Sequence, residues 1–164
     1  MPSRRKTREF VLQVLFASEM TGKDPVASLE FLYRHFVHHE DEEIKVHSVQ
    51  MDFARKLVAA VSLHQESIDR LIGRVSQNWK LHRIPRVDRN ILRIAIAELV
   101  LSSDTPGTVV IDEAIDIGKR FGSENSGAFI NGILDRIYSL EEQAITPHSL
   151  QELLAALDQS FPTS

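Results

Sequence analysis

Four basic side chains crowd the start of the chain, and their chemistry suits the binding of phosphate groups. Arg4, Arg5, Lys6 and Arg8 lie within the first eight residues, with no acidic residue among them. Guanidinium groups bind phosphate through paired hydrogen bonds, and they also stack on unpaired bases. Cations do not stabilise the N-terminus of a helix, because the helix dipole is positive there. The cluster therefore indicates nucleic-acid binding, with a merely solvated helix end as the alternative.

Other side chains with chemical potential favour simpler interpretations. His35, His38 and His39 could share one helix face, but the third ligand or general base of a functional metal site is missing from the pattern. Asp112 and Asp116, four residues apart, indicate a solvated helix face more simply than an acid and base pair. The sequence also lacks a glycine-rich phosphate loop and a nucleophile elbow. We therefore expect a binding protein rather than an enzyme, with no metal and no cofactor.

The composition is that of a globular chain with a core of its own. Of the 164 residues, 43% are hydrophobic and 26% are charged, which is far from the composition of disordered chains. The absence of cysteine excludes disulfides, cysteine zinc sites and thiol nucleophiles. No apolar run reaches the roughly 18 to 20 residues of a membrane span, and the basic start lacks the apolar region of a signal peptide. We therefore expect a cytoplasmic protein without membrane contact.

The first half of the chain predicts amphipathic helices with local start and stop signals. The basic cluster opens a helix from Arg4 to about Met20, which ends before Gly22. Asp24 followed by Pro25 starts the next helix, because aspartate accepts free amide protons and proline lacks the proton that would stay unpaired. Apolar residues at helical spacing then predict two separate helices, with the stripes Val49, Phe53, Leu57, Ala60 and Ile68, Leu71, Ile72, Val75.

The second half predicts three more helices and a helical tail. Asp88 is expected to cap a central, heavily buried helix, and Gly122 is expected to end the following one. The last confident helix starts near Ser126 and includes Asn131-Gly132, which in isolation signals a hairpin turn. Helical spacing outweighs that dipeptide, because neither flank alternates as a strand would. With a further helix starting at Pro147, the chain is expected to be all-α, with about seven helices and an extra C-terminal one.

Three sequence blocks carry a pattern more specific than helical spacing. They read RRKTREF at 4–10, VDRNILRIA at 87–95, and IDEAID at 111–116 followed by FINGILD at 129–135. In this order and at this spacing they resemble the NusB family of transcription antitermination factors, over about Arg4 to Tyr138. The resemblance implies two packed helical subdomains, about residues 1–64 and 65–140, which together form one RNA-binding domain. It leaves residues 141–164 as an extension of unknown role.

The resemblance also implies a function and its partners. NusB-like proteins pair with NusE, a small-subunit ribosomal protein, and the pair binds the boxA element of nascent ribosomal RNA. This binding helps RNA polymerase to read through terminators. By the same resemblance, the RNA site contains the basic start of the chain, and the surface that binds NusE includes Val75, Arg83 and Asp88. We expect Lys119, Arg120 and Asn125 on the neighbouring surface and Phe16 as a stacking platform for a base.

Two positions depart from the usual family pattern, and two other functions stay open. Phe16 stands where the family often has tyrosine, and Asn125 stands where it often has an aspartate that would repel RNA. One alternative is an accessory helical domain for ribosomal RNA modification, since the same domain is fused to RNA cytosine methyltransferases. The other is a protein-interaction module, which could form a homodimer. RNA binding with and without NusE distinguishes these alternatives.

Overall fold

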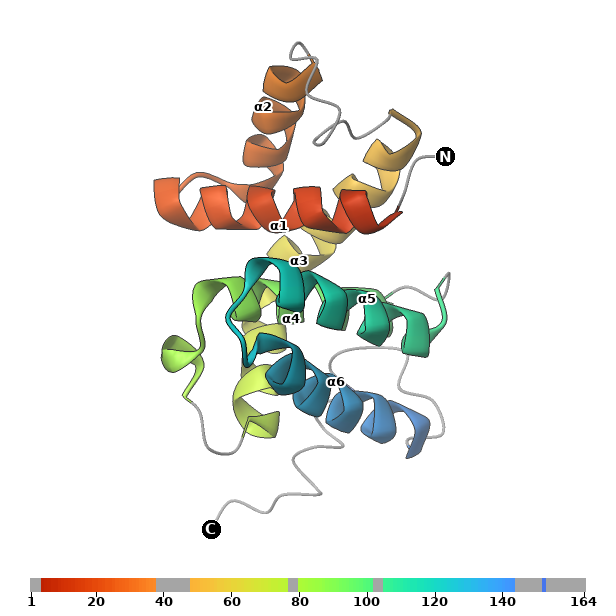
Figure 1. Cartoon of the computed structure of the whole chain (residues 1–164). Coiled ribbons are helices and arrows are strands. Elements are labelled where there is room, and N and C mark those ends of the chain that lie inside the picture. Colours follow the sequence, from red (N-terminus) through yellow and green to blue (C-terminus); the bar gives the residue numbers. More distant parts are fainter. Residues whose placement is uncertain (1–3, 38–47, 77–79, 102–104, 144–151, 153–164) are drawn as a thin grey trace. The chain divides into compact units, whose positions relative to one another are not determined.

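The chain folds into helices, in agreement with the all-α expectation. The computed structural model describes residues 4–37, 48–76, 80–101, 105–143 and 152, and these contain no strand (Figure 1). In chain order the elements are α1 (Arg4–Thr21), α2 (Pro25–Val37), α3 (Ser48–Val75), the 3₁₀ helix η1 (Leu81–Arg83), α4 (Arg86–Leu101), α5 (Gly107–Phe121) and α6 (Ser126–Gln143). The tail helix expected from Pro147, and His38 and His39, lie outside the described residues.

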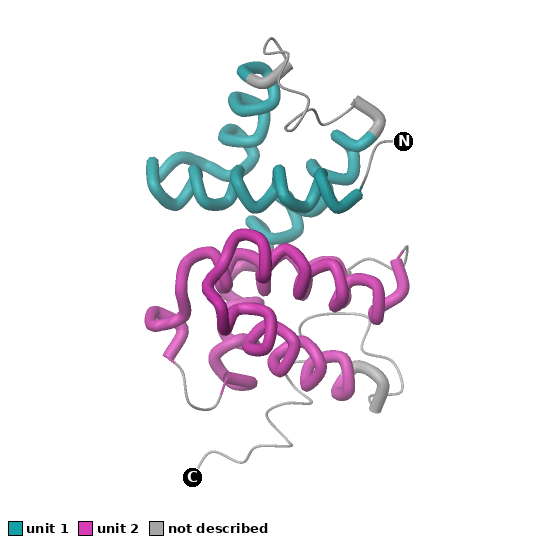
Figure 2. The backbone as a smooth tube through the Cα atoms, viewed as in Figure 1, with its two compact units in different colours: residues 1–63 teal, residues 64–164 magenta. Residues whose placement is uncertain are grey.

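Two compact units divide the chain, and the division falls inside α3. Unit 1 comprises residues 1–63 and unit 2 comprises residues 64–164 (Figure 2). Unit 1 contains α1, α2 and the first part of α3, whereas unit 2 contains the rest of α3 with α4, α5 and α6. Each unit buries an apolar core of its own, as the spacing of apolar residues in its helices requires.

Local hydrogen bonds set the turn between α1 and α2 in unit 1. Gly22 adopts a left-handed backbone conformation (φ 71°), which glycine accepts without steric cost, and its N–H donates to the carbonyl of Ser18 at 2.9 Å. Asp24 Oδ2 accepts a hydrogen bond from the amide of Ala27 at 3.1 Å, just before α2 begins at Pro25. The expected cap and the first-turn proline of α2 are therefore confirmed, and α1 packs against α2.

The two helices expected around 49–60 and 68–75 lie end to end within α3, and a kink separates them, as predicted. α3 runs from Ser48 to Val75 and carries non-helical angles at His64 (φ −110°, ψ 16°). No glycine or proline lies between Ala60 and Ile68. The chain bends at His64, and the second helix follows directly after this kink.

α4 forms the centre of unit 2, as its wide apolar stripe predicted. Every side chain from Asn90 to Leu99 is buried, and α4 packs against both α5 and α6. Arg93 joins α4 to α3 through two hydrogen bonds with Asp69, Nε to Oδ1 at 2.7 Å and Nη2 to Oδ2 at 2.8 Å. Because the Arg93 side chain is only 6% exposed, this ion pair is structural and holds α4 against α3.

α5 and α6 pack closely because small residues line their contact. A Cβ atom on Gly118 would lie 2.6 Å from Ile130 Cδ1, and one on Gly127 would lie 3.1 Å from Lys119 Cγ. α6 continues through Asn131-Gly132, which confirms that helical spacing outweighs the hairpin dipeptide there. Among the helices that the structure describes, none is both long enough and apolar enough to cross a membrane.

Candidate nucleic-acid interface

The basic start of the chain forms the first two turns of α1. Arg4, Arg5 and Lys6 are exposed, whereas Arg8 is only 4% exposed. The first turn of α1 contains no acidic residue, whose negative charge would interact favourably with the positive end of the helix dipole. The structure thus presents three of the four basic residues to solvent on a folded helix, and it places the fourth, Arg8, in a buried position.

An aromatic ring of α3 lies against this basic cluster in unit 1. Arg4 Cζ lies 4.8 Å and Arg8 Cζ 5.4 Å from the centroid of the Phe53 ring. Both distances are within the range of cation–π attraction. The sequence analysis had placed Phe53 in an apolar core stripe, and the ring is half-buried. No local signal could have revealed this contact, because the arginines and the ring come from helices far apart in the sequence.

Phe16, the expected stacking platform, lies further along α1 and is 40% exposed. Arg5 and Phe16 are separated by about three turns of helix, so they lie on nearly the same face of α1, roughly 16 Å apart along its axis. The exposed ring and the exposed guanidinium group of Arg5 therefore border one side of the helix. This arrangement suits a strand whose phosphates contact the cation while a base reaches the ring.

Unit 2 carries its expected RNA residues at the end of α5 and in the turn after it. Lys119, Arg120 and Asn125 are all exposed. Arg120 Cζ lies 5.1 Å from the ring centroid of Phe121, which is 38% exposed although the sequence analysis had placed it in the apolar stripe of the helix. The sequence does carry a signal for this exposure, because two basic residues, Lys119 and Arg120, directly precede the aromatic Phe121. This pattern could have identified Phe121 as a surface residue.

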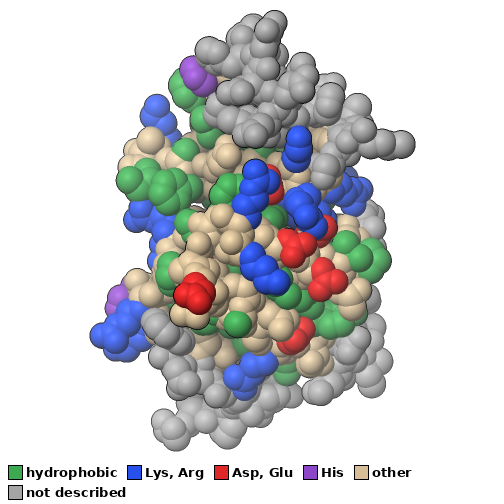
Figure 3. Space-filling view, in the orientation of Figure 1, with side chains coloured by type: hydrophobic (Ala, Val, Ile, Leu, Met, Phe, Trp, Pro, Cys, Tyr) green, Lys and Arg blue, Asp and Glu red, His purple; other side chains and the backbone are tan. Residues whose placement is uncertain are grey.

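Charges of both signs lie along α5. Asp112 and Asp116 are exposed ahead of the basic residues at the end of the helix, and Figure 3 shows acidic and basic side chains interspersed on this face of unit 2. Acids earlier in a helix and cations in its last turn both agree with the helix dipole. The two aspartates therefore form a solvated face of the helix, as the sequence analysis favoured.

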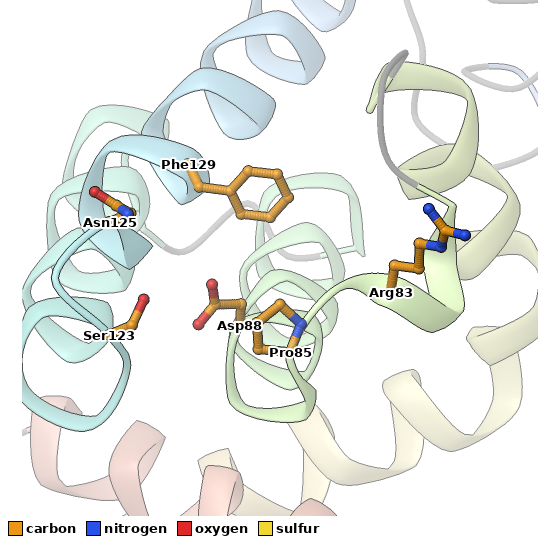
Figure 4. Close-up of a pocket in the computed structure, with 6 residues that line it drawn as sticks. All are labelled: Arg83, Pro85, Asp88, Ser123, Asn125 and Phe129. Carbon is orange, nitrogen blue, oxygen red and sulfur yellow. The ribbon is translucent and has the colours of Figure 1, made fainter.

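A pocket of about 230 Å³ lies beside α4 in unit 2. It is lined by Arg83, Pro85, Asp88, Ser123, Asn125 and Phe129 (Figure 4). Asn125 was expected at the RNA site, whereas Arg83 and Asp88 were expected at the partner surface. The structure brings these three residues to one pocket. Phe129 was not expected to line a pocket, because its position beside Ile130 fits the apolar stripe of α6 as well as it fits the surface.

Asp88 has a different local role from the expected helix cap. α4 begins at Arg86, so Asp88 lies within the first turn, and its side chain is directed to the α5–α6 turn. Its Oδ1 accepts a hydrogen bond from Ser126 Oγ at 2.8 Å, and Ser126 Oγ in turn accepts one from the amide of Ser123 at 2.8 Å. Asp88 is 3% exposed and Ser126 is fully buried. The pair fixes the turn that carries Asn125 against the start of α4.

The other expected partner residues differ in accessibility. Arg83 is exposed at the end of η1, whereas Val75 is 2% exposed at the end of α3. The Val75 carbonyl accepts a hydrogen bond from Arg136 Nη1 at 3.3 Å, which holds the end of α3 against α6. Val75 is therefore a buried residue at the end of α3 and does not itself lie at the surface.

His35 belongs to the expected histidine group and lies in the described part of the chain, where it makes an aromatic contact. The ring of His35 is stacked on that of Phe31, with centroids 6.4 Å apart and an angle of 5° between the planes. In the described part of the chain, no group of three or more histidine, aspartate or glutamate side chains could hold a metal ion.

Comparisons with known proteins agree in family and fold. The sequence profile of the NusB family matches residues 5–139. The transcription antitermination protein NusB of Geotalea uraniireducens (strain Rf4) is 42% identical over 140 residues, which are 85% of this chain and 97% of that relative. The solved structure of T. maritima NusB matches with a TM-score of 0.73 and 36% identity, over 94% of this chain and 99% of that one.

A further solved structure contains bound partners. It is described as antitermination factors NusB and NusE in complex with dsRNA, and it matches with a TM-score of 0.67 and 26% identity, over 83% of this chain and 96% of that one. The profile match spans most of the sequence, and the Geotalea relative exceeds 40% identity over nearly its whole length. The chain therefore belongs to the NusB family of transcription antitermination proteins.

Proposed function

We propose that this protein, together with NusE, binds the boxA element of nascent ribosomal RNA and promotes read-through of terminators by RNA polymerase. Family membership and the similarity to a solved complex of NusB, NusE and RNA support this function. The observation that carries it is the exposed cluster of Arg4, Arg5 and Lys6 at the start of α1. Helix stability does not account for such a cluster, because cations are unfavourable at this end of a helix.

We propose RNA-contacting residues in each of the two units, taken separately. In unit 1, Arg4, Arg5 and Lys6 contact phosphates with Arg8 behind them, and Phe16 offers its exposed ring to a base. In unit 2, RNA contacts come from the end of α5 and the following turn, that is, from Lys119, Arg120 and Asn125. Asparagine suits such a site because it offers hydrogen bonds without a charge that repels phosphate.

NusE, in this proposal, binds unit 2 at the start of α4. Arg83 is exposed there, and Asp88 lines the neighbouring pocket with Asn125, while Val75 is buried at the end of α3. A pocket shared by RNA and partner residues would let protein and RNA binding reinforce each other. The protein acts by binding alone, as a regulatory factor without a catalytic step or cofactor. It works in the cytoplasm, where RNA polymerase makes the transcripts that it binds.

The test substitutes alanine for Arg4, Arg5 and Lys6 together in the full chain. A fluorescent single-stranded boxA RNA is titrated in the presence of NusE at several salt concentrations. Each phosphate contact on a single strand contributes about 0.7 to the slope of log affinity against log salt, so losing three contacts should lower that slope by up to about 2. Thermal stability should stay nearly unchanged, because these side chains are exposed.

A matched control replaces three exposed basic residues outside the proposed site. The Lys23→Ala, Arg34→Ala, Arg70→Ala triple variant removes the same amount of charge and should leave the salt slope close to that of the parent. If both triple variants lower affinity and slope equally, the effect comes from net charge alone. If the Arg4, Arg5 and Lys6 variant binds boxA like the parent, the proposed RNA site is wrong.

A further inference from the structure

The contact of Phe53 with two arginines of the basic cluster has no role in the proposed function so far. Arg4 and Arg8 are four residues apart and therefore share one face of α1. That face meets α3 at Phe53, whose ring centroid lies 4.8 Å from Arg4 Cζ and 5.4 Å from Arg8 Cζ. Arg4 is exposed and Arg8 is 4% exposed, so the ring contacts one guanidinium group at the surface and another beneath it.

A second contact joins the same turn of α1 to α3. Thr7 is 1% exposed, and its hydroxyl lies 3.5 Å from Gln50 Oε1, which is 43 residues away in the sequence. Gln50 and Phe53 lie one turn apart near the start of α3. The first two turns of α1 are thus attached to the first turns of α3 at two points. The basic cluster stands on a packed element, where side chains are positioned more accurately than on a loop.

An aromatic ring in this position offsets two costs of binding phosphate here. The first cost is electrostatic, because the closely spaced cations interact unfavourably with the helix dipole and with one another. The electron-rich face of the ring reduces this cost. The second is the loss of side-chain freedom when a long arginine is immobilised on RNA, which is smaller if the arginine is already held. Attraction to a ring face depends on the charge of the guanidinium group and does not require its N–H donors.

We propose that Phe53 is a positioning residue of the RNA site, and that it holds Arg4 and Arg8 in place before RNA binds. This inference rests on the proposed RNA role of the basic cluster. Phe53 itself contacts no RNA in this proposal. Its loss lowers affinity because Arg4 must then be ordered during binding, while the number of phosphate contacts in the final complex stays the same.

The experiment compares Phe53→Leu with Phe53→Tyr in the full chain, with NusE and the single-stranded boxA RNA. Leucine keeps an apolar side chain but removes the ring, so affinity should fall about 3- to 10-fold, which is the cost of immobilising one long side chain on binding. The slope of log affinity against log salt should stay that of the parent. Tyrosine keeps the ring and can direct its hydroxyl outward from a half-buried position, so it should restore the affinity.

A spectroscopic measurement tests whether the arginine is held before RNA arrives. In the RNA-free parent, the ring current of Phe53 should shift the side-chain proton resonances of Arg4 upfield in NMR spectra. This shift should be absent from Phe53→Leu and retained in Phe53→Tyr. Parent-like resonances of Arg4 in the leucine variant would contradict the proposal.

Phe31→Leu is the matched control, since it removes another ring of unit 1 that has a cation beside it. Lys23 Nζ lies 5.7 Å from the Phe31 centroid, and Phe31 is 65% exposed. Its affinity for boxA should equal that of the parent. If Phe31→Leu and Phe53→Leu weaken boxA binding equally, the positioning role is wrong. It is also wrong if Phe53→Leu and Phe53→Tyr weaken binding equally. Parent-like binding by Phe53→Leu overturns it too, and the proposed function still stands if the triple variant of Arg4, Arg5 and Lys6 loses binding.

Discussion

Ser126 shows how one buried hydroxyl organises a surface. It is fully buried, its Oγ donates to Asp88 Oδ1, and it accepts from the amide of Ser123, each at 2.8 Å. Its partner Asp88 is 3% exposed, so the carboxylate relies on this donor within the fold. Gly122 makes the arrangement fit, because a Cβ atom there would lie 2.6 Å from Ser126 Cβ. The turn that carries Asn125 is thus held by a few polar atoms.

Two substitutions separate the structural and the partner-binding roles of Asp88. Asp88→Asn keeps an acceptor oxygen for Ser126, so we expect a small change in the free energy of unfolding but weaker binding of NusE, because the charge is lost. Ser126→Ala leaves the carboxylate of Asp88 without its donor and should lower the unfolding free energy by about 1–3 kcal/mol. Urea denaturation and NusE titration measure the two effects. NusE affinity equal to that of the parent in Asp88→Asn would rule out a charge contact at this position.

At the scale of elements, an ion pair joins α2 to α3 in unit 1. Arg55 Nε donates to Glu30 Oε1 at 2.8 Å, and Arg55 Nη1 lies 3.6 Å from Asp52 Oδ1. The hydrogen bond and the charge of Arg55 lower the pKa of Glu30, although partial burial of the carboxyl group acts in the opposite direction. The Arg55 side chain is 45% exposed, so solvent weakens the interaction and its effect on stability is small.

Glu30→Gln should reveal this pair through the pH dependence of stability. The pKa of Glu30 is lower in the folded than in the unfolded chain, so the pair stabilises the fold above the ordinary glutamate pKa of 4.5. The stabilisation is lost as the pH falls through the folded-state pKa. The urea midpoints of parent and Glu30→Gln should therefore differ slightly at neutral pH and converge below pH 4.5. When Arg55 is also replaced by Met, the effect of Glu30→Gln on the urea midpoint should no longer depend on pH. If parent and Glu30→Gln still differ in urea midpoint at low pH, the ion pair is not the cause of the difference.

At the scale of the whole molecule, a basic site works within an acidic protein. The net charge is −4, so long-range attraction to RNA is weak and binding depends on local clusters of cations. These clusters lie at the start of α1 and at the end of α5, and the family match, from residue 5 to residue 139, includes all of their residues except Arg4. Nearly all of the machinery that we propose therefore lies in the part of the chain that resembles its relatives.

A chain that ends at residue 143 tests this distribution of function. It retains α1 to α6 and every residue proposed to contact RNA or NusE. We expect its affinities for boxA RNA and for NusE to equal those of the full chain, because the match to the family ends at residue 139. Titrations of both chains under one salt condition provide the measurement. A loss of affinity greater than about threefold would mean that residues 144–164 take part in binding.

The sequence by itself determined the secondary structure and the family. Asp24 and Pro25 start α2, Gly22 follows the end of α1, and α6 continues through Asn131-Gly132, as helical spacing and capping chemistry predicted. These outcomes are local, because helices depend on hydrogen bonds and side-chain contacts only a few residues apart. The two parts of α3 follow the same rule, because their two apolar stripes predicted separate helices and a kink at His64 lies between them.

Only the tertiary structure decided which side chains meet. Phe53 was assigned to the core by its spacing, yet its ring lies over Arg4 and Arg8, and Asn125 lines one pocket with Arg83 and Asp88. Burial also separated Arg8 from the exposed basic residues beside it, although all of them looked equivalent in the sequence. Spacing along a helix fixes the face on which a residue lies. Which element covers that face depends on how helices distant in the sequence pack, and that is settled by the shape and volume of the whole core.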